Sequence, residues 1–96
     1  MYNLKIVYEE NFSKSLLNIL TFISKDKKSA ATTFKNNLKE KIGLLEFSPF
    51  MCEKSKYIDK PNYRDLIFKG YTTIYKVEEN TIKILDIFKW ENRPQV

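Results

Sequence analysis

The sequence predicts an α+β domain with the element order β-α-α-β-β-β, in which a helical hairpin packs on one face of a mainly antiparallel sheet. A strand-like run opens the chain, and two stretches with apolar residues at helical spacing follow it. Three strand-like runs, joined by short turns, close the chain. Because the sequence has 96 residues and shows no linker or internal repeat, residues 1–96 are predicted to form a single domain.

The first strand is predicted over residues 2–8, where apolar and polar side chains alternate as in a strand with one buried face. A helix follows, with Asn11 as its predicted N-cap. Its apolar stripe consists of Phe12, Leu16, Ile19, Leu20 and Ile23. The polar stretch 24–29 interrupts this pattern and is predicted to form the turn of the hairpin.

The second helix carries an apolar stripe that consists of Ala31, Phe34, Leu38, Ile42 and Leu45. Ser48-Pro49 is predicted to end this helix, because proline lacks the backbone N–H that a helix interior needs. We expect both stripes to face the core rather than a ligand. Residues 48–62 show neither helical nor strand periodicity and are predicted to be a loop.

The last three strands are predicted over residues 63–68, 71–77 and 81–88. Gly70 and Asn80 lie in the two turns, and both residue types tolerate positive φ. Because such short turns force antiparallel neighbours, these strands pair in sequence order. The last strand has apolar residues on both faces, which favours a central strand that could hold a bulge and places the first strand beside it.

The composition limits the chemistry that the chain can perform. Lys and Arg number 17 against 12 Asp and Glu, a formal charge of +5, which suits nucleic acid, a ribonucleoprotein surface or an acidic protein partner. An ordinary lysine-rich surface is the alternative. The chain contains no histidine, so any proton transfer would rely on Lys, Arg, Tyr, Asp or Glu. With one cysteine, no zinc motif and no phosphate loop, we predict no metal and no cofactor.

The N-terminal run MYNLKIVYEE places acidic residues where a signal peptide would continue its apolar stretch. No apolar run approaches the roughly 18 residues of a membrane helix. We therefore expect a cytoplasmic protein that has no membrane partner.

The residues that could carry chemistry are cationic and aromatic. The loop and the strand and turn after it contribute Lys54, Lys56, Lys60, Arg64 and Lys69. The tail contributes Lys89, Trp90 and Arg93. If the loop and the tail meet at one end of the sheet, they would suit a phosphate backbone with a stacked base, or equally an acidic partner peptide.

Each of these residues also has a purely structural interpretation. The lysines could be scattered surface charges, and Trp90 could be a core or interface aromatic. Arg64 could form a cross-strand ion pair, for example with Asp86. The acidic residues are interpreted as solvated surface.

Arg64 stands at the head of a strand, and a Gly-Tyr-x-x-x-Tyr-x-Val run, an Ile-x-Ile-x-x-Ile-Phe strand and a tail with Arg and Pro follow it. The residues of this ordered set are Arg64, Gly70, Tyr71, Tyr75, Val77, Ile82, Ile84, Ile87, Phe88, Arg93 and Pro94. Together with the order of the elements, the set resembles the RelE/ParE superfamily. These proteins are the toxin halves of bacterial type II toxin–antitoxin modules, also described as plasmid stabilisation proteins.

The resemblance implies a growth-arresting toxin that a cognate antitoxin holds, with an antitoxin helix or strand laid over the hairpin and the sheet. RelE-like members enter the ribosomal A site and cut mRNA, with Lys and Arg stabilising the developing charge. If the chain is such an endoribonuclease, its catalytic residues are Arg64, Lys54, Lys56 and Arg93. ParE-like members block DNA gyrase and are not enzymes in themselves. Candidate residues for binding the target or RNA are Lys60, Lys69, Lys89 and Trp90.

Two departures from the RelE-like pattern slightly favour inhibition of DNA gyrase. Thr72 stands where many cleaving members have arginine, and Lys89-Trp90 stand where they often have His or Tyr. Losing one oriented charge donor typically costs on the order of 10²–10³ in rate. A third interpretation is a toxin fold that has lost toxicity and serves only as a binding module. The sequence leaves the cellular target, enzymatic activity and the orientation of Arg64 open.

Overall fold

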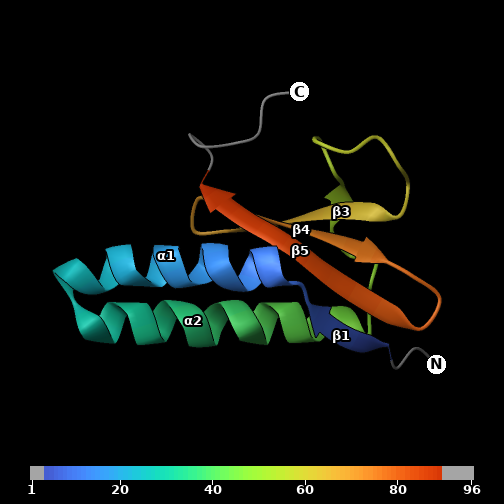
Figure 1. Cartoon of the computed structure of the whole chain (residues 1–96). Helices are drawn as coiled ribbons and strands as arrows, with labels where there is room; N and C mark the ends of the chain where they lie inside the picture. The colour runs from blue at the N-terminus through green and yellow to red at the C-terminus, as the bar shows by residue number, and fades with distance from the viewer. Residues whose placement is uncertain (1–3, 90–96) are drawn as a thin grey trace.

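The computed structural model describes residues 4–89 and, over that range, contains two helices packed on one face of a five-stranded mixed sheet (Figure 1). The sheet order is β1-β5-β4-β3-β2. The elements are β1 (Lys5–Tyr8), α1 (Glu10–Asp26), α2 (Lys28–Gly43), the 3₁₀ turn η1 (Leu44–Glu46), β2 (Glu53–Lys54), β3 (Tyr63–Phe68), β4 (Tyr71–Val77) and β5 (Thr81–Lys89). The predicted α+β class is confirmed.

Strand β5 is central, as its apolar residues on both faces predicted. It pairs in parallel with β1 and antiparallel with β4. The register with β4 passes from Ile74 opposite Asp86 to Tyr75 opposite Ile84, so Leu85 is the extra residue of a β-bulge. Because a one-residue slip reverses the facing of a strand, the helix-facing side chains change from even to odd positions across the bulge. The buried residues of β5 follow this change: Ile82, Ile84 and Ile87.

The core lies between the helical hairpin and the sheet. Both predicted stripes contribute to it, and the side chains of Leu38, Ile42 and Leu45 are fully buried. The Phe34 ring packs against the rings of Phe68 and Tyr71, with centroid distances of 5.4 Å and 5.2 Å. Burying an aliphatic or aromatic side chain of this size stabilises the folded state by roughly 1.5–3 kcal/mol. The helix stripes were therefore interpreted correctly as core-forming.

The helix boundaries differ from those predicted. Helix α1 starts at Glu10, with Glu9 in the N-cap position, so the assignment of Asn11 as the N-cap was wrong. The predicted six-residue break shrinks to Lys27, whose extended backbone separates the two helices. A polar stretch does not by itself end a helix, because packing of the apolar face supplies most of the stability of the helix.

Helix α2 ends at Gly43 rather than at Ser48-Pro49. The 3₁₀ turn η1 follows directly and carries Leu45, the last member of the predicted stripe, into the core. A 3₁₀ turn continues the apolar spacing for one more turn, so the sequence pattern extended the helix too far.

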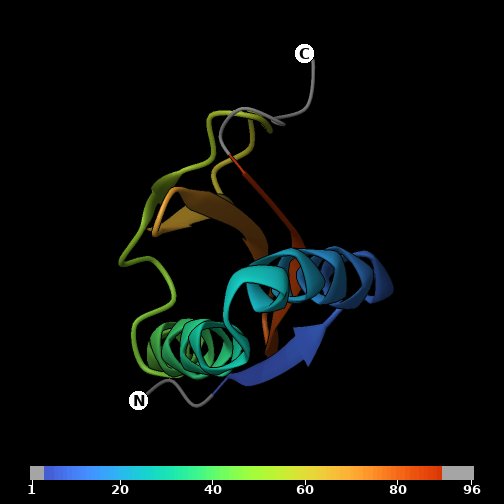
Figure 2. The same ribbon diagram turned by 90° about the vertical axis from the view of Figure 1, so that its left-hand side faces the viewer.

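The predicted loop 48–62 contains a strand that the sequence did not reveal. Strand β2 pairs antiparallel with the start of β3, with Glu53 opposite Asp65 and Lys54 opposite Arg64. Two residues are too few to show a periodicity of two. Figure 2, which looks along the helices, shows the loop running up the edge of the sheet and away from the hairpin. The Tyr57 ring of this loop packs edge-to-face with the Phe88 ring on the sheet face opposite the helices, with 5.1 Å between the two centroids.

The turn between β3 and β4 has positive φ at both of its central residues, 53° at Lys69 and 82° at Gly70. This is the pattern of a type I′ turn, whose twist matches the right-handed twist of the strands it joins. Within residues 4–89, positive φ occurs at these two residues, and Asn80 does not adopt it. No helix in this range is long and apolar enough to cross a membrane.

Tyr75 links the middle of the sheet to the chain that leaves the helices. Its side chain is fully buried on β4, and its hydroxyl donates a hydrogen bond of 2.8 Å to the backbone oxygen of Pro49. Burial raises the pKa of the Tyr75 phenol above its ordinary value of 10.0. The neutral phenol is therefore the form that this site stabilises.

We predict that Tyr75→Phe lowers the free energy of unfolding by about 1 kcal/mol, because the Pro49 oxygen loses its buried donor. The folded chain keeps a phenol proton that the unfolded chain loses above about pH 10. The stabilisation by Tyr75 is thus complete below that pH and declines as the pH rises above it towards the raised pKa of the folded chain. Urea unfolding at about pH 7 and about pH 11 should show the difference between the two proteins shrinking at the higher pH. Tyr57→Phe, at a half-buried ring on the opposite face of the sheet, serves as the control.

Candidate functional site

Arg64 holds the loop that precedes its own strand. Its Nε donates to the backbone oxygen of Pro61 at 3.2 Å, and its Nη1 donates to that of Cys52 at 3.0 Å. The guanidinium carbon lies 4.8 Å from the centroid of the Phe50 ring. These contacts come from both ends of the loop, so the planar donor fork of Arg64 joins them to β3.

The register answers the question of which way Arg64 points. It lies opposite Tyr75 and therefore shares the helix-side face of the sheet. A cross-strand ion pair with Asp86 does not form, because β4 separates β3 from β5. Asp86 instead accepts a hydrogen bond of 2.7 Å from the Ser15 hydroxyl of α1, just after the bulge.

The predicted cations fall into two groups at opposite ends of the sheet. Lys54 is the direct cross-strand neighbour of Arg64, and Lys56 follows in the same loop. Lys60 precedes β3, and its carbonyl accepts the N–H of Tyr63 at 3.1 Å. Lys69 lies in the β3–β4 turn, at the far end of β3.

Lys89 belongs to that far end, because it lies opposite Tyr71 at the start of β4. The four residue steps from Tyr71 to Tyr75 correspond to roughly 13 Å along the strand. The loop and the end of β5 do meet, where the rings of Tyr57 and Phe88 are in contact. Trp90 and Arg93 lie outside the described residues.

A cavity of about 260 Å³ lies between the loop and the sheet face opposite the helices; we call it the loop cavity. It is lined by residues of the loop and of the sheet, among them two of the predicted cations; the lining residues are Met51, Cys52, Glu53, Lys54, Lys56, Tyr57, Asp65, Ile67 and Thr72. Thr72, at the position where many cleaving toxins have arginine, is only 2% exposed here. This position therefore opens into the loop cavity and not onto the surface around Arg64.

Asp65 is the buried acid of this cavity, so the interpretation of all acidic residues as solvated was wrong. Its side chain is 7% exposed, and its Oδ2 accepts the backbone N–H of Lys56 at 2.9 Å. Its Oδ1 is buried and has no hydrogen-bond partner among the described residues. A buried acceptor left unpaired costs on the order of 1–3 kcal/mol. Sequence reasoning missed Asp65 because only the pairing of β2 with β3 buries it.

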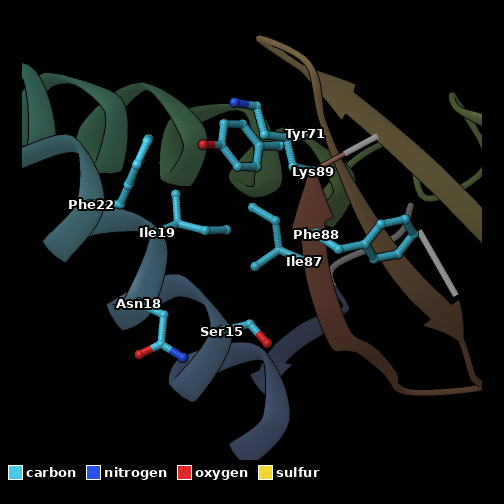
Figure 3. Close-up of a pocket in the computed structure, with 8 residues that line it drawn as sticks. All are labelled: Ser15, Asn18, Ile19, Phe22, Tyr71, Ile87, Phe88 and Lys89. Atoms are coloured by element: carbon cyan, nitrogen blue, oxygen red, sulfur yellow. The ribbon is translucent and has the colours of Figure 1, made fainter. Parts of the chain in front are cut away.

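A second hollow, the α1–β5 groove, has a volume of about 430 Å³ and lies on the helix side of the sheet (Figure 3). Ile19 of α1 and Ile87 of β5 point toward one another across it, whereas Phe88 points to the other side of β5. Phe22 lines one end with 63% of its surface exposed, and the Lys89 ammonium lies 5.8 Å from its ring centroid. In the sequence, Phe22 is a large apolar residue outside the predicted apolar stripe of the helix. That position is the signal that would have pointed to this groove.

The family model for the ParE toxin of the type II toxin–antitoxin system parDE matches residues 6–93 of the chain. The chain belongs to the ParE toxin family. It is therefore a toxin of a type II toxin–antitoxin system, as the resemblance to the RelE/ParE superfamily implied.

Solved structures show that the fold of this ParE-family toxin is shared. A chain from the chromosomal ParDE toxin–antitoxin system of P. aeruginosa is 14% identical and superposes with a TM-score of 0.74, over 93% of this chain and 98% of that one. Two structures of the E. coli DinJ-YafQ complex are 18% and 19% identical, with TM-scores of 0.62 and 0.60. They cover 91% and 90% of this chain and 92% of each matched chain. The comparison with curated proteins gives no match.

We predict that Arg64→Lys lowers the free energy of unfolding of this ParE-family toxin by about 1–2 kcal/mol, because an ammonium cannot bridge both carbonyls. Limited proteolysis should also cut the 48–62 loop faster. Lys54→Ala, at the neighbouring position on β2, is the control and should change stability by less than about 0.5 kcal/mol. A stable Arg64→Lys protein that has lost toxicity would contradict this structural role.

Proposed function

We propose that this ParE-family toxin arrests growth by binding DNA gyrase, and that a cognate antitoxin neutralises it. The observation that carries the proposal is the engagement of Arg64 with the loop. Two of its donor groups are committed to the carbonyls of Pro61 and Cys52, and its flat face lies over Phe50. The cation that a cleaving toxin would direct at a phosphate therefore has a structural role here.

The distribution of charge supports the same proposal. Cleavage of RNA requires several oriented donors that converge on one phosphate. Arg64 and Lys54 lie at one end of the sheet, whereas Lys69 and Lys89 lie at the other. Thr72 is buried in the loop cavity, and the chain has no histidine to act as a base near neutral pH. A binding toxin needs no such convergence.

The proposed antitoxin partner rests on the α1–β5 groove and on the solved structures. The P. aeruginosa chain comes from a ParDE system, and YafQ was crystallised with DinJ. In this chain the groove has an apolar floor at Ile19 and Ile87 and an exposed aromatic wall at Phe22. We propose that an amphipathic antitoxin segment docks there, with acidic residues that complement the net charge of +5.

For the target, we predict that the purified toxin inhibits supercoiling of relaxed plasmid DNA by gyrase, while its induction in cells leaves translated mRNA intact. Lys69→Asn removes a candidate target-binding charge and keeps a residue that tolerates the positive φ of the turn. It should weaken inhibition several-fold, whereas Lys35→Asn on the exposed face of α2 should not.

Mapping of mRNA ends and of plasmid topology in the same induced culture separates the alternatives. Cuts within translated codons would refute gyrase binding and establish the endoribonuclease. Normal growth, with intact mRNA and normal supercoiling, would leave a binding module with a toxin fold.

For the antitoxin, we predict that Phe22→Asp lowers antitoxin affinity at least about tenfold, because it places a charge in the apolar wall of the groove. Leu17→Asp is the matched control, since Leu17 also lies on α1, is 64% exposed compared with 63% for Phe22, and does not line the groove. Equal losses in the two variants, measured by calorimetry, would place the antitoxin elsewhere on the hairpin.

A further inference from the structure

We propose that the loop cavity is a socket for an arginine side chain of a partner protein. Neither gyrase binding nor antitoxin docking in the α1–β5 groove requires such a socket, so the inference goes beyond the proposed function. It starts from Asp65, whose side chain is 7% exposed and lines the cavity. The Lys56 N–H fixes its Oδ2 at 2.9 Å, and its Oδ1 has no partner among the described residues. An ionised carboxylate only accepts hydrogen bonds, so the missing group is a donor.

The second step is that a carboxylate pair faces the cavity. Glu53 lies directly opposite Asp65 in the β2–β3 register, so both side chains project from the same face of the sheet. Within residues 4–89 neither acid takes part in an ion pair. Two like charges at adjacent cross-strand positions repel one another, and a cation between them removes the repulsion.

Lys54 and Lys56 line the cavity as well, but neither forms an ion pair with Asp65 or Glu53. Lys54 lies opposite Arg64, so its side chain projects from the other face of the sheet. Lys56 contributes its backbone N–H to Asp65, and its side chain is exposed. The described residues contain no group of three or more acids and cysteines that could hold a metal ion. The two carboxylates therefore have no cationic partner among the described residues, and a partner molecule can supply one.

A guanidinium group fits this site better than an ammonium. Its planar fork carries five N–H donors, which can reach Oδ1 of Asp65 and the Glu53 carboxylate together. The half-buried Tyr57 ring also lines the cavity and offers an aromatic surface for stacking. A volume of about 260 Å³ admits one long side chain, whereas pockets for drug-sized ligands start at about 300 Å³.

The rim of the cavity indicates that the guanidinium belongs to a protein. Met51 and Ile67 both line the cavity, and they are 50% and 66% exposed. Apolar residues around a buried charged centre are the arrangement of an interface hot spot, in which the rim excludes water from the central contact. Free arginine would cover neither of these side chains.

The test uses the full-length toxin and the blocked peptide acetyl-Leu-Arg-Leu-amide, whose leucines match the apolar rim. We expect it to bind at least about tenfold more tightly than the same peptide with citrulline, which has the shape of arginine without the charge. The lysine peptide should bind more weakly than the arginine peptide, and free arginine should bind more weakly still. Equal binding of the arginine and citrulline peptides would overturn the proposal, and so would a preference for free arginine.

Three variants locate the binding in the loop cavity. Asp65→Asn keeps an oxygen for the Lys56 N–H, replaces the free acceptor by a donor, and should abolish the preference for arginine over citrulline. Asp59→Asn, in the same loop and outside the cavity lining, is the matched control and should keep that preference.

Thr72→Arg provides a second readout that does not depend on Asp65→Asn folding. Thr72 lies opposite Ile67 and diagonal to Asp65, so an arginine there would reach the carboxylates from within the chain. We expect this variant to melt at a higher temperature and to lose peptide binding. Unchanged binding by Thr72→Arg would show that the peptide binds elsewhere and would overturn the proposal.

Discussion

The position of β5 between β1 and β4 is the constraint on which the rest of the structure depends. Its pairing on both sides joins β1 to the three antiparallel strands. The bulge at Leu85 reverses, partway along β5, which side chains point to the helices. After the bulge, Ile87 faces α1 and forms the floor of the α1–β5 groove, while Phe88 faces the other side and meets Tyr57 of the loop. Without that extra residue the two side chains would exchange faces, so Phe88 would face α1 and Ile87 would face the loop.

The loop between η1 and β3 is the second organising feature, because it gives the sheet a covered second face. Tyr75 and Arg64 hold it from the helix side through the carbonyls of Pro49, Cys52 and Pro61. Backbone carbonyls that accept no hydrogen bond within a helix or sheet need a side-chain donor when they are shielded from water. A loop held in this way can bury Asp65 and leave a defined cavity beneath it.

These two features separate the surfaces of the toxin. The α1–β5 groove lies on the helix side, and the loop cavity lies on the opposite face of the sheet. An apolar groove and a carboxylate socket favour different contacts, so the two surfaces suit different segments of one partner or two partners. The fold is shared with ParDE and DinJ-YafQ structures at identities below 20%, so this sheet and hairpin tolerate extensive change of sequence.

The sequence by itself determined the order of the elements, the two core stripes, the Gly70 turn and the central place of β5, because each depends on local periodicity or on the chemistry of one residue. Only the tertiary structure decided the partners of Arg64, the burial of Asp65 and the existence of β2. These depend on strand register and on contacts between distant segments. A slip of one residue, such as the bulge at Leu85, moves every later side chain of the strand to the opposite face of the sheet. The alternation of residues before the slip does not reveal it.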